Sequence, residues 1–157
     1  MKSYKLVSHP SPNFSSRNGR SIEKIIIHHT NVSEEGSLLA LTRKSKIWKR
    51  VSAHYMVSND GETVYQLVDD RYCAWHAGYE NIDSIGIEHV SKRQKPLSDN
   101  GYNSSALLIA ELCKIHNLKP LSAVEPHYVT DRKTVCPSEV DWKLIRSLAA
   151  RILETNE

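Results

Sequence analysis

The chain has 157 residues, of which 39% are hydrophobic and 25% are charged, and its formal net charge is +3. These values predict one ordinary globular domain over residues 1–157, large enough to bury a core without disulfide bonds. The mild charge permits an anionic partner but argues against a nucleic-acid-binding protein, which usually shows a denser basic stripe. The first ten residues lack the apolar core of a secretory signal, and no run approaches a membrane span, so we expect a cytoplasmic protein at synthesis.

The first regular element is expected after an irregular arm at residues 1–20, where prolines, serines and asparagines gather. The three isoleucines at 25–27 fit a strand that is covered on both faces. This strand ends in His28 and His29, whose side chains point to opposite faces. Only one of them can face a given site, and the residues alone equally allow a polar pair that closes the strand.

The next segment, residues 36–48, has apolar spacing that predicts an amphipathic helix. Basic residues follow its exposed side: Lys44, Lys46, Lys49 and Arg50. We interpret them as a solvated face rather than a binding patch. Segments 53–57 and 63–68 then flank Asn-Asp-Gly at 59–61, a pattern typical of a β-hairpin.

Residues 84–90 alternate in the manner of a strand, after a loop or short strand at 75–78. Ser84, Gly86 and Glu88 share one face, while the isoleucines share the other. Glu88 thus lies on the face of small residues, where the glycine leaves room for another group to approach.

The C-terminal third is predicted to be helical. A polar loop is expected at 92–103, followed by a long helix from Ser104 to about Asn117. Ser138 and Asp141 have the capping-box spacing of a last helix. This alternation of strands and helices predicts an α/β domain with a single sheet.

His127 and Cys136 are candidates for chemistry, because the loop between them could fold back and bring them to one point. With His28 they would supply three nitrogen or sulfur ligands and leave a fourth tetrahedral position for water, as in catalytic zinc sites. A closed structural zinc site would need a fourth ligand, and none stands at a useful spacing. The spacing alone is weak support, since eight histidines offer many such triples.

Several motifs together resemble one family, the zinc-dependent N-acetylmuramoyl-L-alanine amidases of the type-2 amidase and peptidoglycan-recognition fold. They occur in the family's order and extend over most of the chain, including the arm at 11–17. The motifs are Ile-Ile-Ile-His-His-Thr at 25–30, Val-Ser-Ala-His-Tyr-Met-Val at 51–57, Trp-His-Ala-Gly at 75–78, Ser-Ile-Gly-Ile-Glu at 84–88 and Arg-Lys-Thr-Val-Cys-Pro at 132–137.

The resemblance implies a mixed central sheet flanked by helices and a role for each matching residue. One Zn²⁺ per chain would be held by His28, His127 and Cys136. Glu88 would be the general base and Lys133 the oxyanion-stabilising group. Trp75, His76 and Gly78 would line the substrate groove, with a structural role for His76 as the alternative. His29 would fall on the other face and be structural, and His54 would be a hydrogen-bonded core residue.

Two departures from the family's pattern bear on these roles. Lys133 stands three residues before Cys136. In family members the lysine often stands two residues before the cysteine, and in this chain Thr134 occupies that position. Either Lys133 or Thr134 could therefore fill the oxyanion role. Ala53 stands where the short phage lysozymes of the family have a tyrosine. Together with Glu88, this groups the chain with the recycling-type members.

The activity that the resemblance implies is hydrolysis of the amide between N-acetylmuramic acid and L-alanine in peptidoglycan or muropeptides. We expect a bacteriolytic phage or prophage endolysin, monomeric, with no nucleic-acid partner, that reaches the cell wall if released through the membrane. The alternatives are a cytosolic amidase that recycles muropeptides and a non-catalytic peptidoglycan-binding module.

Overall fold

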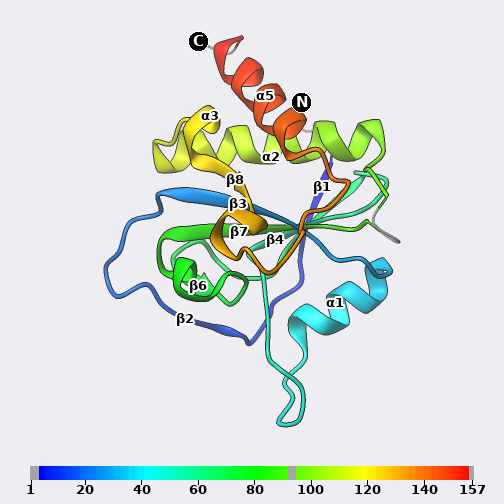
Figure 1. Ribbon diagram of the computed structural model, residues 1–157, viewed down its shortest axis with the longest axis vertical. Helices are drawn as coiled ribbons and strands as arrows, with labels where there is room; N and C mark the ends of the chain where they lie inside the picture. Colours follow the sequence, from blue (N-terminus) through cyan, green and yellow to red (C-terminus); the bar gives the residue numbers. More distant parts are fainter. Residues whose placement is uncertain (1–3, 92–94, 156–157) are drawn as a thin grey trace.

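The computed structural model describes residues 4–91 and 95–155, and its centre is one six-stranded sheet. The strands are β1 (Lys5–Ser8), β3 (Lys24–His29), β4 (Tyr55–Val57), β5 (Thr63–Gln66), β7 (Ser84–His89) and β8 (Val124–Pro126). Their order is β1-β5-β4-β7-β3-β8, in which β4 and β5 pair antiparallel and the other neighbours pair parallel (Figure 1). The predicted hairpin and the mixed sheet are confirmed.

Helices cover both faces of this sheet, as expected. The long helices α2 (Asp99–His116) and α5 (Trp142–Glu154) lie over one face, and α1 (Glu34–Thr42) lies on the other side (Figure 1). Short helical turns complete the fold: η1 (Gly78–Asp83), α3 (Pro120–Ala123) and α4 (His127–Thr130). None of the helices in the described ranges is both long and apolar enough to cross a membrane.

Strand alternation separates the core from the polar face of the sheet. Ile25 and Ile27 of β3 and Ile85 and Ile87 of β7 are fully buried and pack in one cluster with residues of α2 and α5. The residues between them point to the opposite face. The main hydrophobic core therefore fixes which side of β3 and β7 is left for polar side chains.

The N-terminal segment is more regular than the irregular arm expected for residues 1–20. β1 pairs with β5 at the edge of the main sheet, and β2 (Phe14–Ser16) pairs antiparallel with β6 (Tyr72–Ala74) in a separate ribbon. Both strands are short and mostly exposed. They lack the apolar alternation that reveals a buried strand, and their pairing depends on distant partners.

The predicted helix over residues 36–48 is wrong in its second half. α1 starts after Ser33, whose hydroxyl accepts a hydrogen bond from the Gly36 N–H, and it ends at Thr42. Ile47 and Trp48, which the spacing assigned to the apolar face of the helix, lie in the following loop with 90% and 65% of their surfaces exposed.

The two C-terminal helices also begin elsewhere than predicted. α2 begins at Asp99, five residues before Ser104, because the Ser98 hydroxyl caps it by accepting from the Gly101 N–H. Residues 92–94 of the predicted loop lie outside the described ranges. The predicted capping box is wrong, since Asp141 itself is the N-cap of α5 and accepts from the Leu144 N–H at 3.0 Å.

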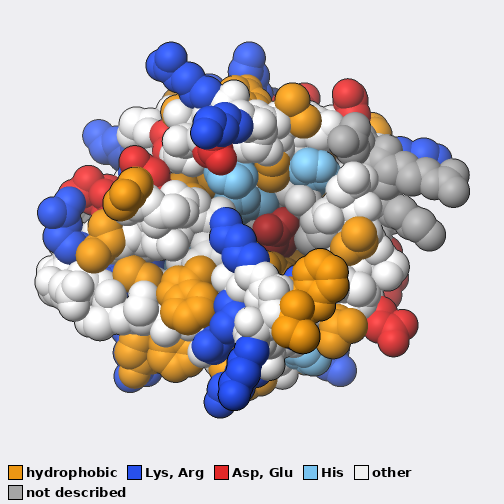
Figure 2. Space-filling view, turned by 60° about the horizontal axis from the view of Figure 1, so that its bottom comes forward, with side chains coloured by type: hydrophobic (Ala, Val, Ile, Leu, Met, Phe, Trp, Pro, Cys, Tyr) orange, Lys and Arg blue, Asp and Glu red, His pale blue; other side chains and the backbone are white. Residues whose placement is uncertain are grey.

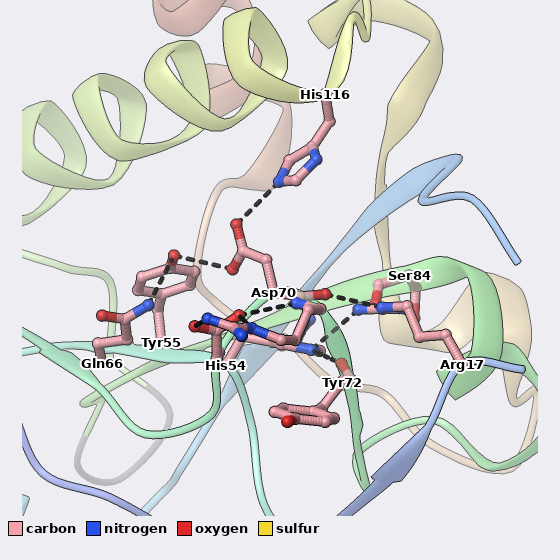
Figure 3. Close-up of polar contacts among 11 residues, drawn as sticks. Arg17, His54, Tyr55, Gln66, Asp70, Tyr72, Ser84 and His116 are labelled. Atoms are coloured by element: carbon pink, nitrogen blue, oxygen red, sulfur yellow. Dashed lines mark hydrogen bonds and ion pairs between the residues drawn. The ribbon is translucent and has the colours of Figure 1, made fainter. Parts of the chain in front are cut away.

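A buried polar cluster ties the N-terminal segment to the sheet (Figure 3). Arg17, 5% exposed, donates to the backbone carbonyls of Asp70, Asn81, Ile82 and Ser84. His54 is fully buried, and its Nε2 lies 2.8 Å from the Tyr72 carbonyl while its Nδ1 accepts from the Gly86 N–H at 3.0 Å. The expectation that His54 is a hydrogen-bonded core residue is confirmed.

His54 should make the stability of the protein depend on pH. Burial, aided by the nearby Arg17, lowers the pKa of His54 to about 4, although the Tyr72 carbonyl opposes this shift. The unfolded chain, with an ordinary pKa near 6.5, therefore binds more protons than the folded chain between these two pH values. The contribution of His54 to the free energy of unfolding should be complete above about pH 6.5. It should fall by up to about 3 kcal/mol as the pH approaches 4.

The measurement is urea unfolding at several pH values for the natural protein and for His54→Gln. The variant should show a smaller loss of unfolding free energy between pH 6.5 and 4, whatever its absolute stability. His9→Gln, outside this cluster, is the control. An unchanged pH slope in His54→Gln would contradict this account.

Candidate active site

The parallel pairing of β3 with β7 builds the floor of the site. In this register His28 is the partner of Glu88, and Glu88 is in turn the partner of Met56 in β4. Partners in adjacent strands share a face, so the imidazole and the carboxylate lie on the same side of the sheet. This is the side opposite the isoleucine core, as the alternation of 84–90 predicted.

His127 and Cys136 reach the same place because the chain between them turns back. β8 ends at Pro126, directly before His127 in the short turn α4. The Tyr128 N–H donates to the Cys136 carbonyl at 3.0 Å, and this bond closes the loop. The loop thus delivers both side chains to the end of β3.

The structure brings His28, His127 and Cys136 together as a group that could hold a metal ion. One possible ligand atom from each residue lies within 4.8 Å of the others. Cys136 Sγ is 3.8 Å from His28 Nδ1, and the rings of His28 and His127 have centroids 4.4 Å apart. The clustering matches the expectation from sequence, while the ligand roles themselves stay predictions.

The chemistry of these three groups fits a divalent cation that accepts nitrogen and sulfur ligands. Burial, reinforced by the neighbouring His127, holds the pKa of His28 well below its usual range, so its imidazole is neutral as a ligand must be. Burial and then the Glu88 carboxylate raise the pKa of the Cys136 thiol to about 12, although the His29 N–H opposes this. The thiol therefore needs a cation beside it to become a thiolate.

A chain of hydrogen bonds fixes which nitrogen of His28 carries the proton. The Ser84 hydroxyl donates to the Glu80 carbonyl, so it can only accept from His76 Nε2, 3.1 Å away. His76 Nδ1 is then an acceptor and receives the proton of His28 Nε2 at 2.8 Å. His28 Nδ1, the nitrogen that faces Cys136, is left with a free lone pair for a metal ion.

Gly86 provides the space for this chain. A Cβ atom at this position would lie 2.5 Å from the ring of His76, closer than atoms can approach. The glycine in β7 therefore allows the His76 ring to sit directly over the strand, beside its partner His28. The group for which the sequence analysis expected Gly86 to leave room is this imidazole.

Glu88 is half-buried, and its Oε2 is shielded from solvent with no hydrogen-bond partner among the described residues. Burial raises the pKa of Glu88 to about 8. An unpartnered carboxyl next to a group that could hold a metal ion is suited to accept and release a proton near neutral pH.

These groups line a cavity of about 450 Å³ at the end of the sheet. In Figure 2, histidine side chains (pale blue) and an acidic side chain (red) lie together in a hollow of this face. Other residues that line the cavity include Val51, Ser52, Trp75, Thr134 and Val135.

The remaining predicted site residues divide into those inside and those outside this cavity. Trp75 and His76 line it, whereas Gly78 and the exposed Lys133 are not among its lining residues. His29 lies outside the three-residue group, although it is among the residues that line the cavity.

The sequence analysis missed the contact of His76 with His28 and the part played by Ser84. The only sequence signal for these contacts was that Ser84, Gly86 and Glu88 share one face of their strand. The position of the 75–78 loop above β7 depends on tertiary contacts that no local pattern encodes.

Comparisons with known proteins identify a family that this chain resembles. A family model described as N-acetylmuramoyl-L-alanine amidase matches residues 18–139. N-acetylmuramoyl-L-alanine amidase A of Achromobacter lyticus is 29% identical over 119 residues, which are 72% of this chain and 63% of that protein. The 1,6-anhydro-N-acetylmuramyl-L-alanine amidase AmpD of Salmonella typhimurium is 32% identical over 114 residues, 64% of this chain and 58% of that protein. The chain thus spans about half to two-thirds of the length of the curated relatives it matches.

Solved structures share the fold. A selenomethionine derivative of AmpD has a TM-score of 0.75 at 22% identity and covers 94% of this chain and 95% of its own. The endolysin amidase LysCS of Clostridium intestinale has a TM-score of 0.74 at 19% identity, covering 91% and 93%. AmiD of Escherichia coli, in complex with the substrate anhydro-N-acetylmuramic acid-L-Ala-D-gamma-Glu-L-Lys, has a TM-score of 0.70 at 24% identity, covering 85% and 58%.

The hydrogen bond from His28 to His76 should control metal affinity. His76→Leu removes the acceptor, so we expect a loss of about ten- to a hundredfold in Zn²⁺ affinity, measured by competition with a chromophoric chelator. His76→Asn places an amide oxygen where Nδ1 now lies and should restore most of the affinity.

His116→Gln, which alters a hydrogen-bonded histidine in the cluster of Figure 3, is the control and should bind Zn²⁺ like the natural protein. Equal Zn²⁺ affinity in the leucine and asparagine variants at position 76 would refute the assignment of the proton.

Proposed function

The chain belongs to the N-acetylmuramoyl-L-alanine amidase family, and on this premise we propose that it hydrolyses the amide between N-acetylmuramic acid and L-alanine in peptidoglycan. The observation that carries the proposal is the group of His28, His127 and Cys136, within 4.8 Å of one another, with Glu88 beside it on the same face. A module that only binds peptidoglycan would not need this group, so its presence supports hydrolysis.

The metal that we propose is one Zn²⁺ per chain, held by His28, His127 and Cys136. Two imidazoles and a thiolate suit zinc and leave its fourth position open, as in catalytic sites. When bound, zinc supplies the Lewis acidity that polarises the scissile carbonyl and makes water more acidic.

Glu88 is proposed as the general base. Its carboxylate accepts a proton from the attacking water and passes it to the amine of L-alanine as that amine leaves. Because burial raises its pKa, the carboxyl can carry the proton between the two transfers near neutral pH. Its unpartnered Oε2 has no competing hydrogen bond among the described residues.

We propose that Lys133 offsets the negative charge of the tetrahedral oxyanion, with Thr134 as the other candidate. Thr134 lines the cavity, whereas Lys133 is exposed in the same loop, one residue away. A Lys133→Met variant with normal activity would assign the role to Thr134.

Trp75 is proposed to form the wall against which substrate packs. Its indole Nε1 donates to the Ser15 hydroxyl at 3.1 Å, and the Arg50 guanidinium lies 5.2 Å from its ring centre. These two contacts hold the wall in place. We propose that His76 acts indirectly, by accepting the hydrogen bond from His28. Gly78 is not among the residues that line the cavity.

The biological role that we propose is lysis of the polymeric cell wall. The amidase LysCS, named an endolysin, shares the fold, and a positive net charge favours binding to an anionic wall. In this role the protein is made in the cytoplasm and acts after release through the membrane. AmpD and AmiD also share the fold, so the alternative is recycling of soluble muropeptides.

The test is release of L-alanine amino groups from purified sacculi and from soluble muropeptides by the zinc-loaded protein. Glu88→Gln should lower the rate by about a hundredfold or more while the protein still binds one Zn²⁺ per chain. A lytic enzyme should act on sacculi, and a recycling enzyme on muropeptides alone.

Glu125→Gln is the matched control, because Glu125 is another partly buried carboxyl on the sheet whose pKa burial raises. It lies outside the cavity-lining residues and should retain activity. Binding to sacculi without release of amino groups would replace the proposed hydrolase with a recognition module.

A further inference from the structure

Residues 43–50, between α1 and β4, form a loop of unusual composition that we call the basic loop. Its sequence is Arg-Lys-Ser-Lys-Ile-Trp-Lys-Arg, with five cations in eight residues and no acidic residue. Figure 1 shows this loop, in cyan-green, projecting from the lower end of the molecule away from the sheet. The proposed hydrolysis uses only its last residue, Arg50, which packs on Trp75.

The tip of the basic loop is apolar and held away from the core. Ile47 is 90% exposed and Trp48 is 65% exposed. The backbone N–H groups of both residues donate to the Ser45 hydroxyl, at 3.1 and 3.0 Å, so the tip has a defined turn. The Arg43 guanidinium lies 5.5 Å from the centre of the Trp48 ring. Local contacts thus present two large apolar side chains to the surroundings.

The lysines of the basic loop are available to a partner. Lys44, Lys46 and Lys49 are all exposed. In the part of the chain that the structure describes, no carboxylate lies within ion-pair distance of any cation of this loop. Figure 2, which brings this end forward, shows basic side chains (blue) beside hydrophobic ones (orange) below the histidine-lined hollow.

We propose that the basic loop docks on an anionic lipid bilayer, with Ile47 and Trp48 in the interface and the lysines among the headgroups. An anionic polymer would satisfy the cations but leave the Ile47 side chain in water. An uncharged apolar partner would cover the tip but leave the cations without counter-charges. The interface of an anionic bilayer meets both requirements, because it accepts tryptophan and aliphatic side chains beside lysine and arginine.

Docking through this loop brings the cavity to the membrane surface. The loop ends in Arg50, which donates through Nε to the Asn13 side chain at 2.7 Å and packs on Trp75. The chain continues at once into Val51 and Ser52, which line the cavity. A protein docked by its basic loop therefore holds the cavity within the length of one loop from the bilayer.

The test is co-sedimentation of the full chain with vesicles of phosphatidylcholine alone or mixed with phosphatidylglycerol. We expect binding only to the mixed vesicles, weakened by salt and accompanied by a blue shift of tryptophan emission. The paired change Ile47→Ser and Trp48→Ser should weaken binding by about tenfold or more, because it removes the apolar contact. Changing Lys44, Lys46 and Lys49 to Gln should abolish it.

Matched controls alter similar side chains elsewhere. Leu121→Ser changes another exposed apolar residue, and a triple change to Gln at Lys114, Lys119 and Lys143 removes the same charge from exposed positions outside the basic loop. Both should bind like the natural protein. Thermal melting verifies that every variant is folded.

Three results would overturn the proposal. One is equal vesicle binding by loop and control variants, and another is no vesicle binding at all. The third is loop-dependent binding to sacculi that carry anionic polymers without binding to vesicles, which would make the partner a wall polymer. The amidase assay on soluble muropeptides is separate, so its outcome does not decide this test.

Discussion

The parallel register between β3 and β7 is the constraint on which the site depends. It pairs His28 with Glu88 while Ile25 and Ile27 face the core beside α2 and α5. A slip of one residue would turn every side chain of a strand to the other face and bury the polar groups among isoleucines. The hydrophobic core that stabilises the sheet therefore also places the imidazole and the carboxylate side by side.

Directed hydrogen bonds between side chains order the polar face of this sheet. Ser84 and His76 determine which nitrogen of His28 is free, and the absent side chain of Gly86 provides the space in which they do so. Two features of the site are unfavourable as they stand. Glu88 Oε2 is buried without a hydrogen-bond partner among the described residues, and burial raises the pKa of the Cys136 thiol, which opposes its ionisation. Both become favourable next to a divalent cation, because positive charge stabilises a thiolate and a carboxylate.

Much of this arrangement could be predicted from sequence where a pattern is local. The isoleucine run before His28 and the alternation around Glu88 predicted two strands and their faces, and the motifs that resemble the family pointed to the three residues that the structure brings together. Edge strands and helix ends were predicted poorly, because exposed residues in β1 and caps such as Asp141 depend on tertiary contacts. His76 was assigned to the groove without its contact to His28, since its loop is positioned by packing over Gly86.

The measurement that tests the central claim most directly is X-ray absorption at the zinc edge on the zinc-loaded protein. The account predicts a four-coordinate ion with two imidazole nitrogens, one sulfur and one further light atom, and loss of the sulfur signal in Cys136→Ser. A zinc environment without sulfur, or one that is identical in Cys136→Ser, would contradict the assignment of His28, His127 and Cys136 as the metal centre.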